Sequence, residues 1–291
     1  MTLGQLLARA ERRLRAARLF YGHGTGNARD EAAFIVLRAL HLPFDASRAK
    51  RVSAAHGERV EALLRKRIGE RIPAAYLLEE AWLEGRSFYV DRRVIVPRSH
   101  IGALLTARLK PWLRGRPGRI LDLCTGSGCL AILAALAFPD SKVDASDLSA
   151  DALAVAAINV RRYRLQRRVR LVRSDLFRAL KGERYDVIVC NPPYVPSRTM
   201  RALPPEYRHE PGIALAGGRT GLDLASRILV EAPSFLQPGG ILVCEVGGIR
   251  RAVERAFPRE PLLWPQDEVF IREAPRTAVP SRTRARRQEA S

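Results

Sequence analysis

The chain of 291 residues is poor in lysine and cysteine and has no long apolar segment. No apolar stretch reaches the roughly 18 residues that a membrane helix needs, and no apolar block with a cleavage site follows the arginine-rich amino-terminal segment. Four cysteines without a Cys-x-x-Cys pair favour reduced core thiols over zinc ligands or disulfides. We therefore expect a cytoplasmic protein with no membrane contact.

Positive charge is abundant, and it is almost entirely arginine. The formal net charge is +20, and lysine occurs only at positions 50, 66, 110, 142 and 181. Such a charge indicates nucleic acid or a ribonucleoprotein as a partner, so contact with rRNA through a basic surface is one expectation. A compositional preference for arginine explains the same count, and both interpretations stay open.

Changes of pattern along the chain predict two domains. Residues 1–81 carry apolar residues at helical spacing and predict a small helical domain that packs on the rest of the chain, binds a partner, or both. Residues 82–97 hold two apolar runs on either side of Asp91-Arg92 and predict a β-hairpin linker. Residues 98–274 are expected to form the second domain, and residues 275–291 a disordered basic tail.

The fold class predicted for residues 98–274 is α/β, because short apolar runs alternate with helical patterns. The predicted strands are 120–123, 142–146, 169–173, 186–190 and 241–245, with a later edge strand at 269–272. Helices are predicted near 130–137, 150–163 and 221–235. This alternation implies a parallel sheet.

The tetrapeptide Asn191-Pro192-Pro193-Tyr194 follows the apolar run 185–190. Two prolines cannot continue a strand, so the tetrapeptide lies at a carboxyl end, where open α/β sheets bind ligands. The Asn191 side-chain oxygen and the Pro192 carbonyl are two acceptors for a planar nitrogen that carries two hydrogens. Tyr194 offers a ring face to a flat group or a cation. A capped Pro-Pro turn is the structural alternative.

The first predicted strand runs into a glycine loop that contains Asp122, Thr125, Gly126 and Gly128. These glycines let the backbone approach a ligand, and the helix that follows presents free N–H groups. A dinucleotide fingerprint has a third glycine, or sometimes alanine, where this chain has Ala131. We therefore expect a cofactor at this loop.

The next two predicted strands also end in carboxylates. Asp147, with Leu148 beside it, follows the second strand, and a carboxylate there accepts both hydroxyls of a ribose. Asp175 follows the third strand and is placed to accept the amine of an adenine, with Leu176 or Phe177 on the plane of the base. Any one of these acids alone is equally well explained as a helix cap, so the prediction depends on their order.

Together, Asp122 to Cys129, Asp147, Asp175-Leu-Phe and Asn191-Pro-Pro-Tyr resemble the S-adenosylmethionine-dependent methyltransferases with a seven-stranded Rossmann-like sheet. More narrowly, the chain resembles the HemK/PrmB protein-(glutamine-N5) methyltransferases over roughly residues 1–273. The stretches 206–211 and 214–218 carry the resemblance beyond the cofactor motifs.

The stretch Val96-Pro97-Arg98-Ser99 resembles the branch of this family that acts on ribosomal protein L3. His100 and Ala103 depart from that branch, which commonly has proline and an acidic residue at these two positions.

This resemblance implies transfer of a methyl group from S-adenosyl-L-methionine to the side-chain nitrogen of a glutamine in ribosomal protein L3, either free or in a large-subunit assembly intermediate. It implies cofactor contacts by Asp122, Thr125, Gly126, Gly128, Asp147, Leu148, Asp175, Leu176 and Asn191. Asn191, Pro192 and Tyr194 are the expected catalytic residues, and Pro193 and Glu210 are added as substrate contacts. We expect no metal and no covalent enzyme intermediate.

Three other functions stay open at this point. Class I peptide chain release factors are the alternative substrate within the same family. An adenine-N6 nucleic-acid methyltransferase also grips a flat amine with Asn-Pro-Pro-Tyr and fits the positive charge. A non-catalytic protein that binds RNA or the ribosome, with a relict cofactor fold, is the alternative outside enzymes.

Overall fold

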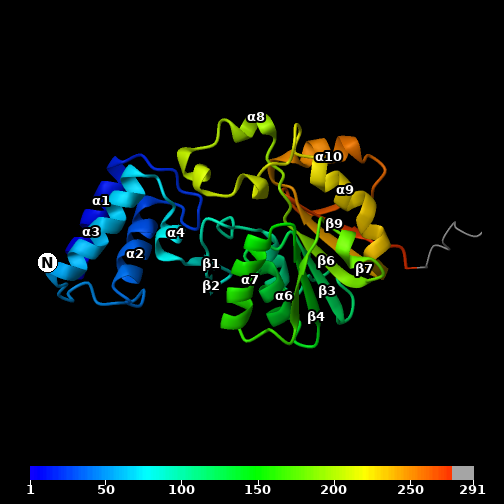
Figure 1. The fold of residues 1–291 in the computed structure, drawn as a ribbon, viewed down its shortest axis with the longest axis horizontal. Helices are drawn as coiled ribbons and strands as arrows, with labels where there is room; N and C mark the ends of the chain where they lie inside the picture. The colour runs from blue at the N-terminus through cyan, green and yellow to red at the C-terminus, as the bar shows by residue number, and fades with distance from the viewer. Residues whose placement is uncertain (277–291) are drawn as a thin grey trace, which may run out of the picture.

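A computed structural model describes residues 1–276, and its amino-terminal part is a bundle of helices (Figure 1). The helices are α1 (Leu3–Ala16), α2 (Ala28–Ala39), α3 (Ala54–Gly69) and the short α4 (Ala74–Leu78). Thr2 and Gln5 form a reciprocal capping box that begins α1. The bundle, called here the helical module, packs around a core that includes Leu3, Leu6, Leu14, Ile35, Val36, Val60 and Leu64.

The β-hairpin lies earlier in the chain than the sequence predicted. Strands β1 (Ala81–Leu83) and β2 (Arg86–Phe88) pair antiparallel, and the turn is Glu84-Gly85 rather than Asp91-Arg92. Both turn residues have positive φ, at 49° and 69°, which matches the favoured two-residue hairpin turn. The expected second half is not a strand, because its valines at 90, 94 and 96 are buried against other residues, including Tyr76, Ala152 and Val155.

A seven-stranded sheet forms the rest of the described chain, in the order β5-β4-β3-β6-β7-β9-β8 (Figure 1). Its strands are β3 (Arg119–Leu123), β4 (Lys142–Asp147), β5 (Val169–Arg173), β6 (Tyr185–Cys190), β7 (Leu236–Glu245), β8 (Leu263–Gln266) and β9 (Val269–Glu273). Strands β3, β4, β5, β6 and β7 are parallel to one another, and β9 is antiparallel to β7. The α/β prediction is confirmed. Strand β8 was missed, because Pro265 interrupts its pattern.

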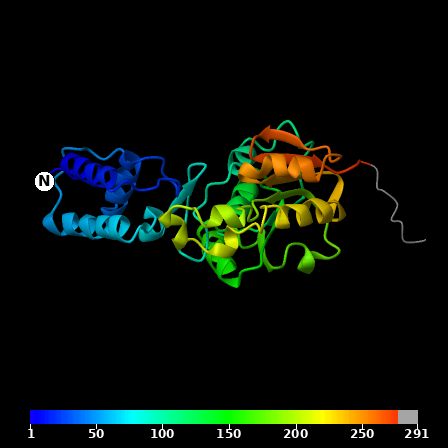
Figure 2. The ribbon, with the colours of Figure 1, turned by 90° about the horizontal axis from the view of Figure 1, so that it is seen from above.

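Helices cover both faces of this sheet (Figures 1 and 2). One face packs against α5 (Ile101–Thr106), α6 (Cys129–Ala137) and α7 (Ala150–Arg162). The other packs against α9 (Asp223–Glu231) and α10 (Arg250–Ala256). Both faces of the central strands are therefore buried, as their continuous apolar runs require. Across residues 1–276, the structure contains no helix that is long and apolar enough to cross a membrane.

A long connection, called here the strap (residues 195–216), follows the Asn-Pro-Pro-Tyr tetrapeptide and contains α8 (Ser197–Met200). Its two ends meet, because Val195 N–H donates to Leu215 O at 2.8 Å and Gly217 N–H donates to Val195 O at 2.9 Å. Between these ends the strap, yellow-green in Figures 1 and 2, extends from the sheet to the helical module.

Residues 277–291 lie outside the described residues, so the predicted tail is described only at 275–276.

Candidate functional site

The order in which the chain adds strands to the sheet reverses between β3 and β6, which makes this the topological switch point. From β3 the chain adds β4 and β5 on one side, and from β6 it adds β7 on the other. Open α/β sheets bind ligands at the carboxyl ends of the strands at such a switch point. The glycine loop after β3 and Asn191 after β6 therefore meet at this point, since Leu123 and Cys190 are register partners.

Hydrogen bonds to Asp122, a residue of β3, hold the glycine loop in place. Its Oδ2 accepts hydrogen bonds from Thr125 Oγ1 at 2.5 Å and from the Ala131 N–H at 2.9 Å. Gly126 and Gly128 have φ of 55° and 80°, a conformation that only glycine adopts without strain. Burial raises the pKa of the Asp122 carboxyl to about 7. Because its side chain is fully buried, Asp122 supports the loop from beneath rather than at the surface.

Asp147 lies at the tip of β4 and faces the glycine loop. Its Oδ2 accepts from the Gly126 N–H and its Oδ1 from the Ser149 N–H, both at 2.9 Å. Burial raises the pKa of Asp147 above its ordinary value. Leu148, next in the chain, is 50% exposed, so an apolar surface is open at this strand tip.

Asp175 and Leu176 lie at the tip of β5 and have different surroundings. The Asp175 carboxylate forms an ion pair of 3.0 Å with Arg227 of α9. Leu176 is buried and has a positive φ of 45°. Asp175 therefore has an exposed carboxylate beside the sheet edge, whereas the Leu176 side chain is largely covered.

The tetrapeptide Asn191 to Tyr194 directly follows the last residue of β6, as the sequence predicted. Pro192 is buried, whereas Asn191, Pro193 and Tyr194 keep partial exposure. Within residues 1–276, no backbone hydrogen bond reaches the Pro192 carbonyl. That carbonyl therefore keeps its acceptor capacity beside the partly exposed Asn191 amide.

Three glycines fit closely around Tyr194, and no sequence pattern marks the third, Gly247. A Cβ on Gly217 would lie 2.6 Å from Tyr194 Cα, and one on Gly221 would lie 2.4 Å from Tyr194 O. A Cβ on Gly247 would lie 2.4 Å from ring atom Cε2 of Tyr194. Burial raises the pKa of the Tyr194 hydroxyl, which therefore stays protonated, and the Gly247 backbone lies close against the ring.

Glu210 lies on the strap and has no exposed side-chain surface. Its carboxylate accepts two hydrogen bonds of 2.6 Å from Arg98 and one of 2.9 Å from the Val96 N–H. The sequence predicted that Glu210 contacts the substrate. In the structure its buried carboxylate instead binds Arg98 and the Val96 N–H and so holds the strap. Arg98, which holds Glu210 and lies 5.4 Å from the Tyr207 ring centroid, remains partly exposed.

Two further polar residues, missed from the sequence, form hydrogen bonds with residues in and directly after the predicted linker. Glu245, at the end of β7, accepts from Ser99 Oγ at 2.6 Å and from the His100 N–H at 3.0 Å. Asn159 of α7 bonds to both backbone groups of Tyr89 and to the Ser127 carbonyl in the glycine loop. No local pattern marks either residue, because their partners are distant in the sequence.

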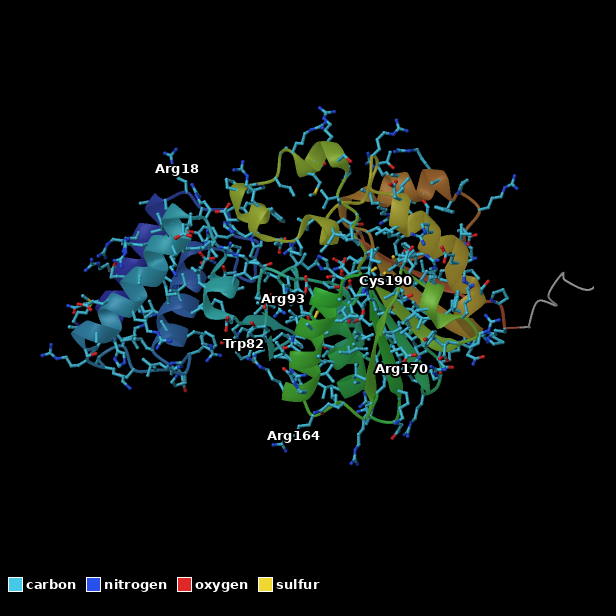
Figure 3. All side chains as sticks on the ribbon, viewed as in Figure 1. Arg18, Trp82, Arg93, Arg164, Arg170 and Cys190 are labelled. Atoms are coloured by element: carbon cyan, nitrogen blue, oxygen red, sulfur yellow. The ribbon has the colours of Figure 1, made fainter. Side chains whose placement is uncertain are left out.

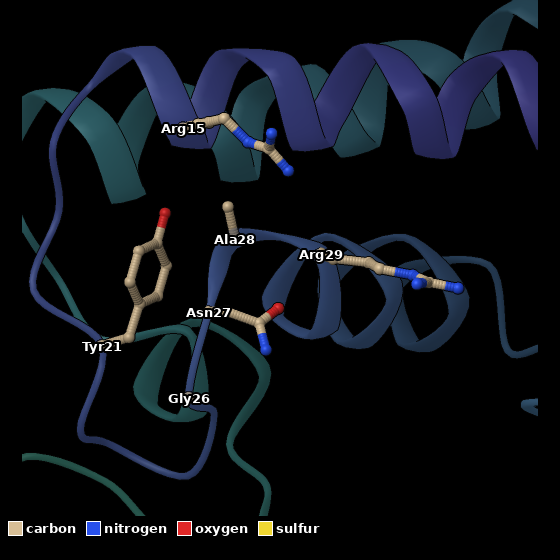
Figure 4. Close-up of a pocket in the computed structure, with 6 residues that line it drawn as sticks. All are labelled: Arg15, Tyr21, Gly26, Asn27, Ala28 and Arg29. Atoms are coloured by element: carbon tan, nitrogen blue, oxygen red, sulfur yellow. The ribbon is translucent and has the colours of Figure 1, made fainter.

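A separate hollow lies within the helical module, lined by Arg15, Tyr21, Asn27 and Arg29 at the start of α2 (Figure 4). It contains none of the predicted site residues. The four cysteines are all free thiols. In the part of the chain that the structure describes, no group of three or more His, Cys, Asp or Glu side chains is arranged to hold a metal ion.

The sheet order, the glycine loop and the row of polar strand tips define a class I methyltransferase, a class whose methyl donor is S-adenosylmethionine. In agreement, residues 102–202 match the model of the methyltransferase small domain family. A solved methyltransferase from Pyrococcus furiosus aligns with 75% of this chain and 98% of its own, at 20% identity and a TM-score of 0.46.

Curated relatives identify the family within this class. The ribosomal protein uL3 glutamine methyltransferase of Bordetella pertussis is 55% identical over 90% of both chains. The proteins of the same name from Burkholderia pseudomallei and Neisseria meningitidis serogroup B are 50% and 47% identical, over 90% of this chain and 90% and 88% of their own. The chain belongs to the family of ribosomal protein uL3 glutamine methyltransferases.

Proposed function

We propose that this enzyme methylates the side-chain nitrogen of a glutamine in ribosomal protein uL3, with S-adenosylmethionine as the donor. The observation that carries the proposal is the position of Asn191 and the Pro192 carbonyl at the switch point of the sheet, beside the glycine loop. The relatives at 47–55% identity support uL3 as the substrate.

The residues around the glycine loop fit the donor. Gly126 faces open space, which leaves room for a ligand against the backbone. Asp147 accepts one hydrogen bond on each oxygen, so both oxygens keep lone pairs for the hydroxyls of a ribose. Leu148 presents an apolar surface to a flat base, and Asp175 a carboxylate to its amine. Bound there, S-adenosylmethionine supplies an electrophilic methyl group.

Asn191 and Pro192 would act on the substrate amide. The lone pair of an amide nitrogen is delocalised into its carbonyl, so this nitrogen is a poor nucleophile. Acceptors at the Asn191 side chain and the Pro192 carbonyl would hold both N–H bonds and turn the lone pair outward. The same two acceptors would stabilise the positive charge that develops on the nitrogen. Proton loss follows methyl transfer, because the nitrogen then becomes acidic.

Tyr194 and Pro193 would complete the wall of the substrate site. Gly217 and Gly221 lie against the backbone of Tyr194 and Gly247 lies against its ring, a close fit that suits a residue that positions a flat group. Arg98 supports this wall, because its bond to Glu210 holds the strap beside the tetrapeptide. Residues 98–274 are, in this proposal, the methyltransferase domain, and residues 1–81 are the substrate-recognition domain.

We also propose that the enzyme acts in the cytoplasm and contacts rRNA, meeting uL3 in a large-subunit assembly intermediate. The net charge of +20 supports this partner. Exposed arginines such as Arg18 and Arg164 extend from opposite parts of the molecule (Figure 3). Titration with rRNA fragments at rising salt concentration tests this contact, and binding that does not weaken with salt would contradict it.

The deciding experiment is mass spectrometry of purified uL3 and of a class I release factor, each incubated with enzyme and S-adenosylmethionine. We expect a single methyl group on one glutamine of uL3, which Asn191→Ala abolishes. A methyl group on the release factor alone would transfer the proposal to that substrate. No methylation of either purified protein, despite cofactor binding, would point to RNA or to the assembly intermediate as the substrate.

A further inference from the structure

The connection between α1 and α2 carries an exposed aromatic side chain, Phe20, beside the strap. Its side chain is 37% exposed, on a protein whose surface is otherwise highly charged. The Phe20 ring lies 5.5 Å from the ring of Tyr207 on the strap and 6.1 Å from the ring of His23. Phe20 therefore belongs to a surface that the helical module and the strap form together.

Buried charges hold the backbone of Phe20 on both sides. Its N–H donates to Glu206 Oε1 of the strap at 3.1 Å, and its carbonyl accepts from Arg67 Nη2 of α3 at 2.9 Å. Arg67 also bonds to Glu206 at 3.2 Å and to Glu31 of α2 at 2.7 Å. The side chains of Arg67, Glu31 and Glu206 are at most 2% exposed.

The pKa values of the two buried carboxyl groups are shifted in opposite directions, because burial still raises that of Glu31. Burial acts to raise the pKa of Glu206, but the hydrogen bonds from Phe20 and Arg67 outweigh it and hold that pKa below its ordinary value. Burying three charged groups costs free energy that a well-packed apolar cluster would not. We therefore interpret the network as a positioning device, which holds the backbone of Phe20 and fastens the strap to the helical module.

The surface continues from Phe20 to the catalytic tetrapeptide. Tyr207 lies against the guanidinium of Arg98, at 5.4 Å, and Arg98 in turn donates two hydrogen bonds of 2.6 Å to Glu210 of the strap. Ile213 is also on the strap, three positions before Ala216, which bridges to Val195 next to Tyr194. The Ile213 side chain is 59% exposed.

We infer that Phe20, Tyr207 and Ile213 form a docking surface for the segment of the substrate protein that carries the target glutamine. The segment would lie extended between the helical module and Asn191, with one apolar side chain on Phe20 and another on Ile213. Rigid, exposed aromatic and apolar groups at the centre of an interface carry most of its binding energy. This inference rests on the proposed function, because the occupant is the substrate of the same site.

Binding of uL3 to the enzyme with S-adenosylhomocysteine, measured by calorimetry, tests this surface. We expect Phe20→Ala and Ile213→Ala each to weaken binding by about tenfold. Phe44→Ala and Val230→Ala are matched controls, since Phe44 and Val230 are 57% and 69% exposed on other parts of the surface. Both controls should bind uL3 within about twofold of the wild type, and all four variants should keep cofactor affinity.

Methylation kinetics then separate docking from chemistry. Phe20→Ala should raise KM for uL3 and leave kcat within about threefold, because uniform binding is lost. Equal effects of the test and control variants, or no binding of uL3 by the wild type, would overturn the inference. A loss of affinity for RNA fragments with unchanged affinity for uL3 would overturn it too. Binding that depends on Phe20 without any methyl transfer would instead leave the docking surface standing and refute the proposed function.

Discussion

The two halves of the site are built from contacts of very different range. On the cofactor side, Asp122 fixes the glycine loop through Thr125, three residues further along the chain. On the substrate side, Glu206 and Glu210 of the strap bond to arginines 139 and 112 residues earlier in the sequence. The proposed cofactor half thus depends mainly on the sheet, whereas the proposed substrate half depends on the strap pairing with Arg98 and, through Arg67, with the helical module.

The largest effect should follow Arg67→Met, which leaves Glu31 buried without a counter-charge and Glu206 with only the partly exposed Arg71 as its partner. We expect the free energy of unfolding to fall by about 3–5 kcal/mol in urea titrations. Arg71 is the matched control, because it also contacts Glu206 but is 33% exposed. Arg71→Met should cost less than about 1 kcal/mol. Equal losses of stability in the two variants would show that the buried pair of Arg67 and Glu206 contributes no more than the exposed pair of Arg71 and Glu206.

Asn191→Ala should affect chemistry rather than assembly. We expect kcat for uL3 methylation to fall by about 10²–10³, because one acceptor for the developing charge is removed. The dissociation constant for S-adenosylmethionine, measured by calorimetry, should change by less than about tenfold, since the loop after β3 is untouched. A variant that loses cofactor affinity while keeping kcat would assign Asn191 to the cofactor half instead.

His23 makes the substrate half sensitive to acid. Burial, against the attraction of Glu210, lowers the pKa of His23 from 6.5 to about 4. The unfolded chain therefore binds a proton that the folded chain excludes, so stability falls as the pH falls from 6.5 towards 4. The loss is on the order of 3 kcal/mol at its largest. Unfolding curves of His23→Leu should lose this part of the pH dependence; an unchanged slope would mean that His23 is protonated in the fold.

Gly247→Ala should give the smallest effect and refine the comparison within the site. The new Cβ would lie 2.4 Å from the Tyr194 ring, at a φ of 50°, so the ring must move. We expect kcat to fall by about tenfold from misplacement of this wall. Gly248→Ala is the control, because a Cβ there meets nothing within 4 Å. If both variants behave alike, the position of the Tyr194 ring does not limit the reaction.

The sequence predicted the parts that local patterns specify. Strand β6 was recognisable because a buried parallel strand is a continuous apolar run, and Pro192 marked its end. The glycine loop was predicted from its residue types alone. The hairpin was misplaced, because buried valines such as Val90 imitate strand alternation while packing between other elements. Arg67, Glu206 and Gly247 were missed, since each acts on a partner that only the folded chain brings near.

The bridge between Val195 and Ala216 joins the two ends of the strap, so the strap is a closed loop on the body of the fold. Its two ends leave and rejoin the body side by side, so a strap of different length or sequence requires no change of register in the sheet. In the function proposed above, a new substrate therefore requires changes in the strap and in its partners Arg67 and Arg98, while β6 and the glycine loop stay intact.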